Sequence, residues 1–120
     1  KAFIGQYPNV VFSMVGHSHE NRIRSIVPVP SAGGAHAWWE ILTSAIADYP
    51  HQFRIAEIFD QDNGWLMMRA TVVDFSVEGD PVAEQGRKRG VTDVTSGWLS
   101  RAGGGIATDR NVELWIPKPD

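Results

Sequence analysis

The first strongly apolar run of the chain lacks polar alternation. Residues 10–15 read Val-Val-Phe-Ser-Met-Val and are followed by Gly16. A short run of this kind is typical of a strand buried on both faces, so we expect the most buried strand of the fold here. Residues 22–29 predict a second strand ended by Pro28 and Pro30, residues 31–35 a glycine-rich turn, and residues 38–43 a third strand.

The next pattern predicts a β-hairpin. Residues 53–59 and 65–75 are rich in β-branched and aromatic residues, and Asp-Gln-Asp-Asn-Gly separates them. Asn-Gly favours the positive φ angles of a hairpin loop, so we expect the two runs to pair antiparallel. In the second run, every other residue is apolar and should form one face: Leu66, Met68, Ala70 and Val72.

Glycine becomes frequent after residue 75. Asp80-Pro81 predicts the start of a short helix ending near Gly90, and residues 92–102 predict another helix stopped by three glycines. Otherwise we expect residues 76–105 to form an irregular arm. Residues 111–116 alternate and predict a last strand or a docked tail. The expected fold is strand-rich α+β, with residues 1–75 as its β-rich part and residues 76–120 as arm and tail of the same domain.

Composition excludes several functions. The 120 residues include no cysteine, so disulfides, thiolate zinc sites and a cysteine nucleophile are excluded, while either redox compartment is compatible. The net charge of −3 argues against a nucleic-acid partner. No apolar stretch approaches the roughly 20 residues of a membrane span. We expect a soluble protein, cytoplasmic or exported. Because the chain lacks an initiator Met and a polar lead-in, we also expect a segment of a longer protein.

Two histidines directly follow the first apolar run. Residues 16–19 read Gly-His-Ser-His. Imidazole is a ligand of Zn, Mn and Fe, and two histidines two positions apart beyond a strand end can project the same way. Gly16 permits the sharp turn that would bring both rings to one centre. The pattern indicates a metal site at His17 and His19; two exposed loop histidines, or one adventitious ion, are the alternatives.

The same residues carry a family resemblance. Residues 8–22, with Gly-His-Ser-His inside them, resemble the last metal-binding box, Gly-His-x-His, of the calcineurin-like metallophosphoesterases. Residues 38–45 (Trp-Trp-Glu-Ile-Leu-Thr-Ser-Ala), 48–58 and 109–114 resemble one bacterial subgroup of that superfamily. The resemblance covers most of the chain, although the box itself spans four residues.

The resemblance implies a fold and an activity. It implies that the chain is the C-terminal part of a four-layer αββα sandwich with a binuclear metal centre of Mn, Fe or Zn. His17 would ligate one metal and His19 the other, and a phosphate ester would be hydrolysed by metal-activated water. Asn21 and Arg22, beside the box, could contact the phosphate.

The earlier boxes of the family do not occur in this chain. Asp-x-His, Gly-Asp-x-x-Asp and Gly-Asn-His are all missing from the sequence. We therefore expect the remaining ligands to come from an upstream part of the same polypeptide, and the 120-residue chain alone to be inactive. His36 and His51 are expected to be exposed turn residues, and Asp48 to cap a turn.

A non-catalytic function is the alternative. The chain has five tryptophans, and a β-rich binding module could use a tryptophan surface to bind a sugar or peptide. We expect that surface to consist of Trp38, Trp39 and Trp65. Alternatively, the tryptophans simply fill the core.

Overall fold

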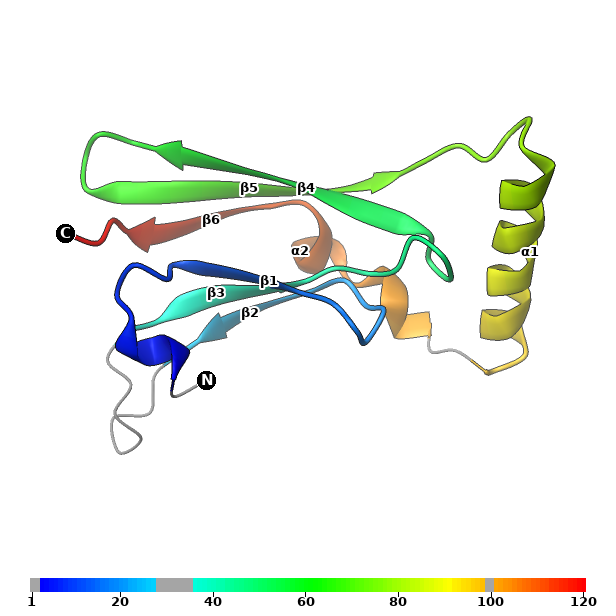
Figure 1. The fold of residues 1–120 in the computed structure, drawn as a ribbon, viewed down its shortest axis with the longest axis horizontal. Helices are drawn as coiled ribbons and strands as arrows, with labels where there is room; N and C mark the ends of the chain where they lie inside the picture. The colour runs from blue at the N-terminus through cyan, green and yellow to red at the C-terminus, as the bar shows by residue number, and fades with distance from the viewer. Residues whose placement is uncertain (1–2, 28–35, 99–100) are drawn as a thin grey trace.

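A computed structural model describes residues 3–27, 36–98 and 101–120 (Figure 1). The fold is α+β and strand-rich, as predicted, with two three-stranded sheets. The first sheet has the order β1-β3-β2 and consists of β1 (Phe12–Val15), β2 (Arg22–Ile26) and β3 (Trp38–Leu42). Strand β3 is parallel to β1 and antiparallel to β2. All three predicted strands are confirmed. The predicted proline stop and the turn over residues 31–35 lie outside the described residues.

The most buried strand of this sheet is β3, not β1. In β3, Trp38, Ile41 and Leu42 are all buried, whereas in β1 the side chains of Met14 and Val15 are 51% and 39% exposed. The prediction for residues 10–15 was therefore wrong. The physical reason is sheet position: among the described strands β1 has a neighbour on one side only, while β3 lies in the middle. The apolar composition of residues 10–15 does not distinguish an edge strand from a central strand.

The second sheet contains the predicted hairpin. Its order is β4-β5-β6, all antiparallel, with β4 (Gln52–Asp60), β5 (Trp65–Asp74) and β6 (Val112–Pro117). The turn uses positive φ angles at Asp62 and Gly64, and the Asn63 side chain accepts a hydrogen bond from the backbone N–H of Trp65. Strand β6 confirms the predicted last strand and joins the second part of the chain to the first.

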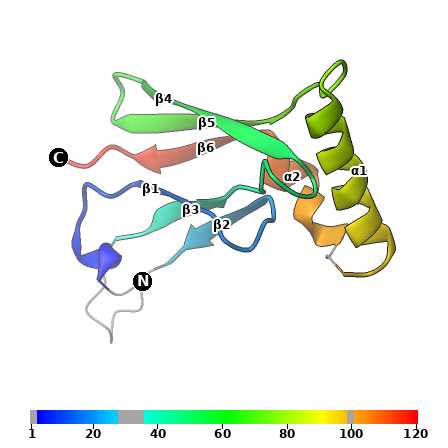
Figure 2. The same ribbon diagram turned by 45° about the vertical axis from the view of Figure 1, so that its right-hand side comes forward.

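The core lies between the two sheets, which run side by side in Figures 1 and 2. Its buried centre consists of residues from β3, β5 and β6: Ile41, Met68, Ala70 and Leu114. The predicted apolar face of the second hairpin strand is confirmed, since Met68, Ala70 and Val72 are buried. The Trp39 indole N–H donates to the backbone carbonyl of Trp115 over 3.0 Å and so links the sheets directly.

One long helix occupies half of the expected irregular arm. Helix α1 (Pro81–Thr95) begins as predicted, with the Asp80 carboxylate accepting from the N–H groups of Val82 and Ala83. It does not end near Gly90, and residues 92–95 are its last turn rather than the start of another helix, so both predictions were wrong. A Cβ at Gly90 would lie 2.3 Å from His51 Nε2. This glycine therefore permits close packing and is not a stop signal.

Short helical turns complete the fold. They are η1 (Ile4–Gln6), η3 (Arg101–Gly104) and α2 (Ala107–Arg110). Helix α2 contacts β2 and β5 and so lies at one end of both sheets (Figure 2). In the described part of the chain, no helix is long and apolar enough to cross a membrane.

Candidate metal-binding site

The histidine loop, residues 16–21, connects the carboxyl end of β1 to β2. His17 and His19 are exposed there. Both have left-handed backbones, with φ angles of 85° and 52°. This region is uncommon for residues that carry a Cβ, and such conformations persist only where the surrounding structure enforces them. The loop therefore has a shape imposed by its contacts.

Asp48 provides one of these contacts. Its Oδ2 atom lies 2.9 Å from Nδ1 of His19, and the two side chains are 33% and 47% exposed. Histidines that bind metals usually donate their other ring N–H to a carboxylate or carbonyl, which orients the ring. Asp48 was expected to cap a turn, and its contact with His19 was not predicted, because no spacing rule connects residues in two different loops.

Imidazole is a suitable ligand for a divalent metal ion, but one or two imidazoles do not complete a coordination shell. Zinc takes four ligands, and imidazole nitrogen is among its usual donors. Among residues 3–27, 36–98 and 101–120, no group of three or more His, Asp or Glu side chains could hold an ion. The donor chemistry of His17 and His19 thus fits part of a metal site.

A buried polar network lies beneath the histidine loop. Asn21 is 2% exposed; its Nδ2 donates to Gln52 Oε1 over 2.8 Å, and its Oδ1 accepts from the backbone N–H of Ser44. The structure therefore places Asn21 in the interior, where it fixes the base of the loop. Arg22 is placed differently: its side chain is 51% exposed and its Nη1 lies 3.6 Å from Glu20 Oε1.

Arg54 lies at the centre of this buried polar network. Its guanidinium donates to the backbone carbonyls of Asp109 and Arg110 over 2.7 Å and 2.9 Å, and also to Asn21 Oδ1. Burial lowers the pKa of Arg54, while the charge of Asp109 opposes that shift. Sequence reasoning overlooked the network. A signal existed, because Gln52 and Arg54 are polar residues on the face of β4 that continues with Ala56.

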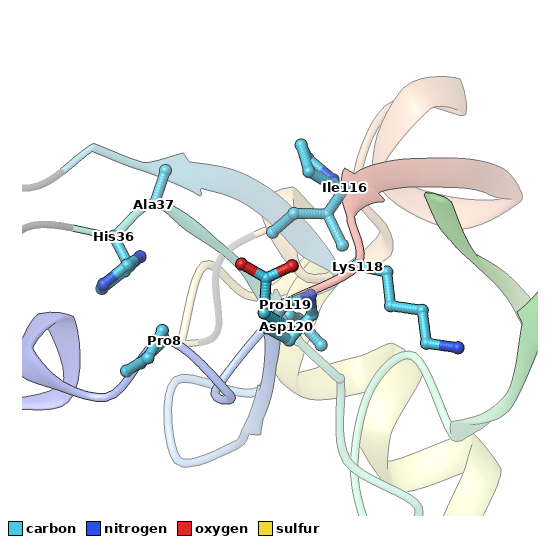
Figure 3. A pocket seen from close by; sticks show the side chains of 9 residues that line it. Pro8, His36, Ala37, Ile116, Lys118, Pro119 and Asp120 are labelled. Carbon is cyan, nitrogen blue, oxygen red and sulfur yellow. The ribbon is translucent and has the colours of Figure 1, made fainter. Parts of the chain in front are cut away.

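The remaining two histidines, His36 and His51, lie away from the histidine loop. His51 is 5% exposed, contrary to the prediction, because its Nδ1 lies 3.0 Å from the carbonyl of Ile46 and its ring packs against Gly90. His36 is half-buried and lines a groove of about 520 Å³ that also involves Ile116 and Lys118 (Figure 3). Since β1 and β3 are parallel, this groove lies at the amino end of these strands, opposite the histidine loop.

The predicted tryptophan surface was wrong. Trp38 is 2% exposed, and its indole N–H donates to Ser13 Oγ over 3.2 Å. Trp39 is half-buried at the junction of the sheets, so Trp65 alone of the three is exposed. Of these three indoles, those of Trp38 and Trp39 form hydrogen bonds to neighbouring strands.

Comparisons of the chain with protein-family models, with curated proteins and with solved structures found no match. A functional conclusion therefore depends on the histidine loop and its contacts.

Proposed function

We propose that this chain is the C-terminal segment of a binuclear metal-dependent phosphoesterase similar to the calcineurin-like superfamily. His17 and His19 would each ligate one of two divalent ions, Mn, Fe or Zn. The observation that carries the proposal is the histidine loop itself: two histidines on left-handed backbone directly after a strand, with one ring hydrogen-bonded to a carboxylate. The carboxylate partner is typical of metal-binding histidines, which usually donate their other ring N–H to such a group.

The fold is compatible with the implied sandwich. Two sheets packed over a shared apolar core would supply strands for both inner layers. The exposed apolar side chains of β1, Met14 and Val15, suit a strand that gains a neighbour in a larger sheet. An upstream part of the polypeptide would supply that neighbour, the outer helices and the remaining metal ligands. The four-layer αββα arrangement thus belongs to the whole protein.

Each residue of the loop has a distinct task in this proposal. His17 and His19 bind the ions, and Asp48 contacts the ring of His19. Arg22, whose exposed guanidinium contacts Glu20, would bind an oxygen of a phosphate ester, because arginine suits phosphate geometry. Divalent ions would activate water and neutralise charge on the phosphoryl group during its in-line displacement.

The decisive experiment uses the longer protein. Its upstream sequence should contain Asp-x-His, Gly-Asp-x-x-Asp and Gly-Asn-His boxes in that order. Hydrolysis of a chromogenic phosphomonoester and a phosphodiester is measured with Mn²⁺ or Zn²⁺ restored after chelation. We expect His17→Ala and His19→Ala to lower turnover by about two orders of magnitude or more, because each removes a ligand to an ion that stabilises the transition state.

The matched control is His36→Ala, which removes an imidazole from the opposite end of β1 and β3 and should leave turnover within about twofold of the unmodified protein. Circular dichroism establishes that all three variants fold. Equal turnover in His17→Ala and the unmodified protein would overturn the assignment of the site, as would missing upstream boxes.

A further inference from the structure

We infer that Asp48 is a positioning residue, one that sets the tautomer of His19 and thereby presents its Nε2 lone pair to a metal ion. The inference rests on the proposed function for the identity of the ligand. Asp48 itself touches neither a metal nor a substrate in this role. It acts through the imidazole ring.

The geometry defines the direction of the hydrogen bond. An ionised carboxylate only accepts, so the 2.9 Å contact requires a hydrogen on Nδ1 of His19. In a neutral imidazole the other nitrogen, Nε2, then carries the lone pair. Without a partner on Nδ1, histidine in water favours the opposite tautomer, with its hydrogen on Nε2. That tautomer cannot bind a metal through Nε2.

Both partners are held in place from outside the pair. The carbonyl of Asp48 accepts from the backbone N–H of His51 over 2.7 Å, which closes the turn that carries the carboxylate. On the other side, a Cβ at Gly103 would lie 2.8 Å from the carbonyl oxygen of His19. Gly103 also accepts at its carbonyl from the backbone N–H of Asn21. The segment before α2 thus packs tightly on the histidine loop and limits its movement away from Asp48.

The other carboxylate near the loop is engaged differently. Glu20 Oε1 lies 3.5 Å from Ser18 Oγ and 3.6 Å from Arg22 Nη1. Glu20 directly follows His19 in the sequence, whereas Asp48 is distant in sequence and contacts the His19 ring. Glu20 is therefore the matched control for a local loss of negative charge.

The test measures the tautomer directly. Long-range ¹H–¹⁵N correlation spectra of the 120-residue chain identify which ring nitrogen carries the hydrogen, at about pH 8, where an ordinary histidine is neutral. We expect His19 to carry it on Nδ1 in the unmodified chain and in Glu20→Gln. In Asp48→Ala we expect it on Nε2. Asp48→Asn should restore Nδ1, because the amide oxygen still accepts a hydrogen bond.

A Zn²⁺ titration of the same samples tests the metal-binding function separately from the positioning role of Asp48. We expect Asp48→Ala to weaken the affinity about 10- to 100-fold, with Asp48→Asn recovering part of the loss. If His19 carries its hydrogen on Nε2 in the folded, unmodified chain, the role of Asp48 is overturned. If the tautomer changes as expected and yet no variant binds Zn²⁺ at the loop, Asp48 sets the tautomer but the metal-binding function fails.

Discussion

The hairpin turn and the histidine loop both place residues on left-handed backbone, but different contacts support them. The hairpin turn uses Asp62 and Gly64 and closes with a local hydrogen bond from the backbone N–H of Gln61 to the carbonyl of Trp65. The histidine loop uses His17 and His19 instead. Its supports come from distant parts of the chain. The comparison teaches that the hairpin turn forms from its own sequence, whereas the histidine loop is shaped by the fold around it.

The sheets that carry these turns differ in the same way. Nine consecutive residue pairs, from Gln52↔Asp74 to Asp60↔Leu66, join the hairpin strands across a short turn. Strand β1 has four pairs, all with a strand more than 20 residues away in sequence. Strand pairs between segments far apart in the sequence are lost more easily when one tertiary contact is removed. Damage to those supports should therefore affect the histidine loop first.

The largest expected effect comes from Arg54→Ala. The substitution leaves the part-buried backbone carbonyls of Asp109 and Arg110, and the buried Asn21 Oδ1, without their charged donor. We expect the free energy of unfolding to fall by about 3 kcal/mol, since buried acceptors that lose a charged partner are costly. Chemical denaturation measures this change.

Arg69→Ala is the control for Arg54→Ala. Arg69 also lies on the second sheet, but its ion pair with Glu113 is half exposed, so its removal should cost less than about 1 kcal/mol. Similar losses in the two variants would contradict the account of the buried network as the support of the loop.

Smaller changes in stability, of opposite sign, are expected when two glycines of α1 are replaced by alanine. Gly90→Ala places a Cβ 2.3 Å from His51 Nε2 and 3.1 Å from the backbone nitrogen of Tyr49, so it should destabilise the chain by about 1–3 kcal/mol. At Gly86 a Cβ would meet no described atom within 4 Å. Gly86→Ala should therefore stabilise the helix by about 0.5–1 kcal/mol.

Thermal unfolding of the two glycine variants checks this pair. A shift of both melting temperatures in the same direction would show that α1 does not pack on the turn at residues 49–51. Because Asp48 directly precedes that turn, the result would weaken the structural basis of the contact between Asp48 and His19.

Local signals in the sequence predicted the hairpin, the N-terminus of α1 and the last strand. Asn-Gly and the cap formed by Asp80 act within a few residues, so a pattern can reveal them. The burial of β1, the contact of Asp48 with His19 and the interior position of His51 depend on segments that meet only in the folded chain. Gly90 was misread for a related reason: a glycine can indicate either a helix end or a close contact, and only the structure distinguishes the two.

The most direct test of the central claim asks where a divalent ion binds on the chain. Substoichiometric Mn²⁺ broadens the NMR signals of nearby nuclei, so even weak binding by two imidazoles is detectable. We predict that the ring signals of His17 and His19 broaden first, that those of His36 and His51 stay sharp, and that a chelator reverses the change. Equal broadening of His36, or unchanged broadening in His17→Ala and His19→Ala chains, would contradict the assignment of the histidine loop as a metal-binding site.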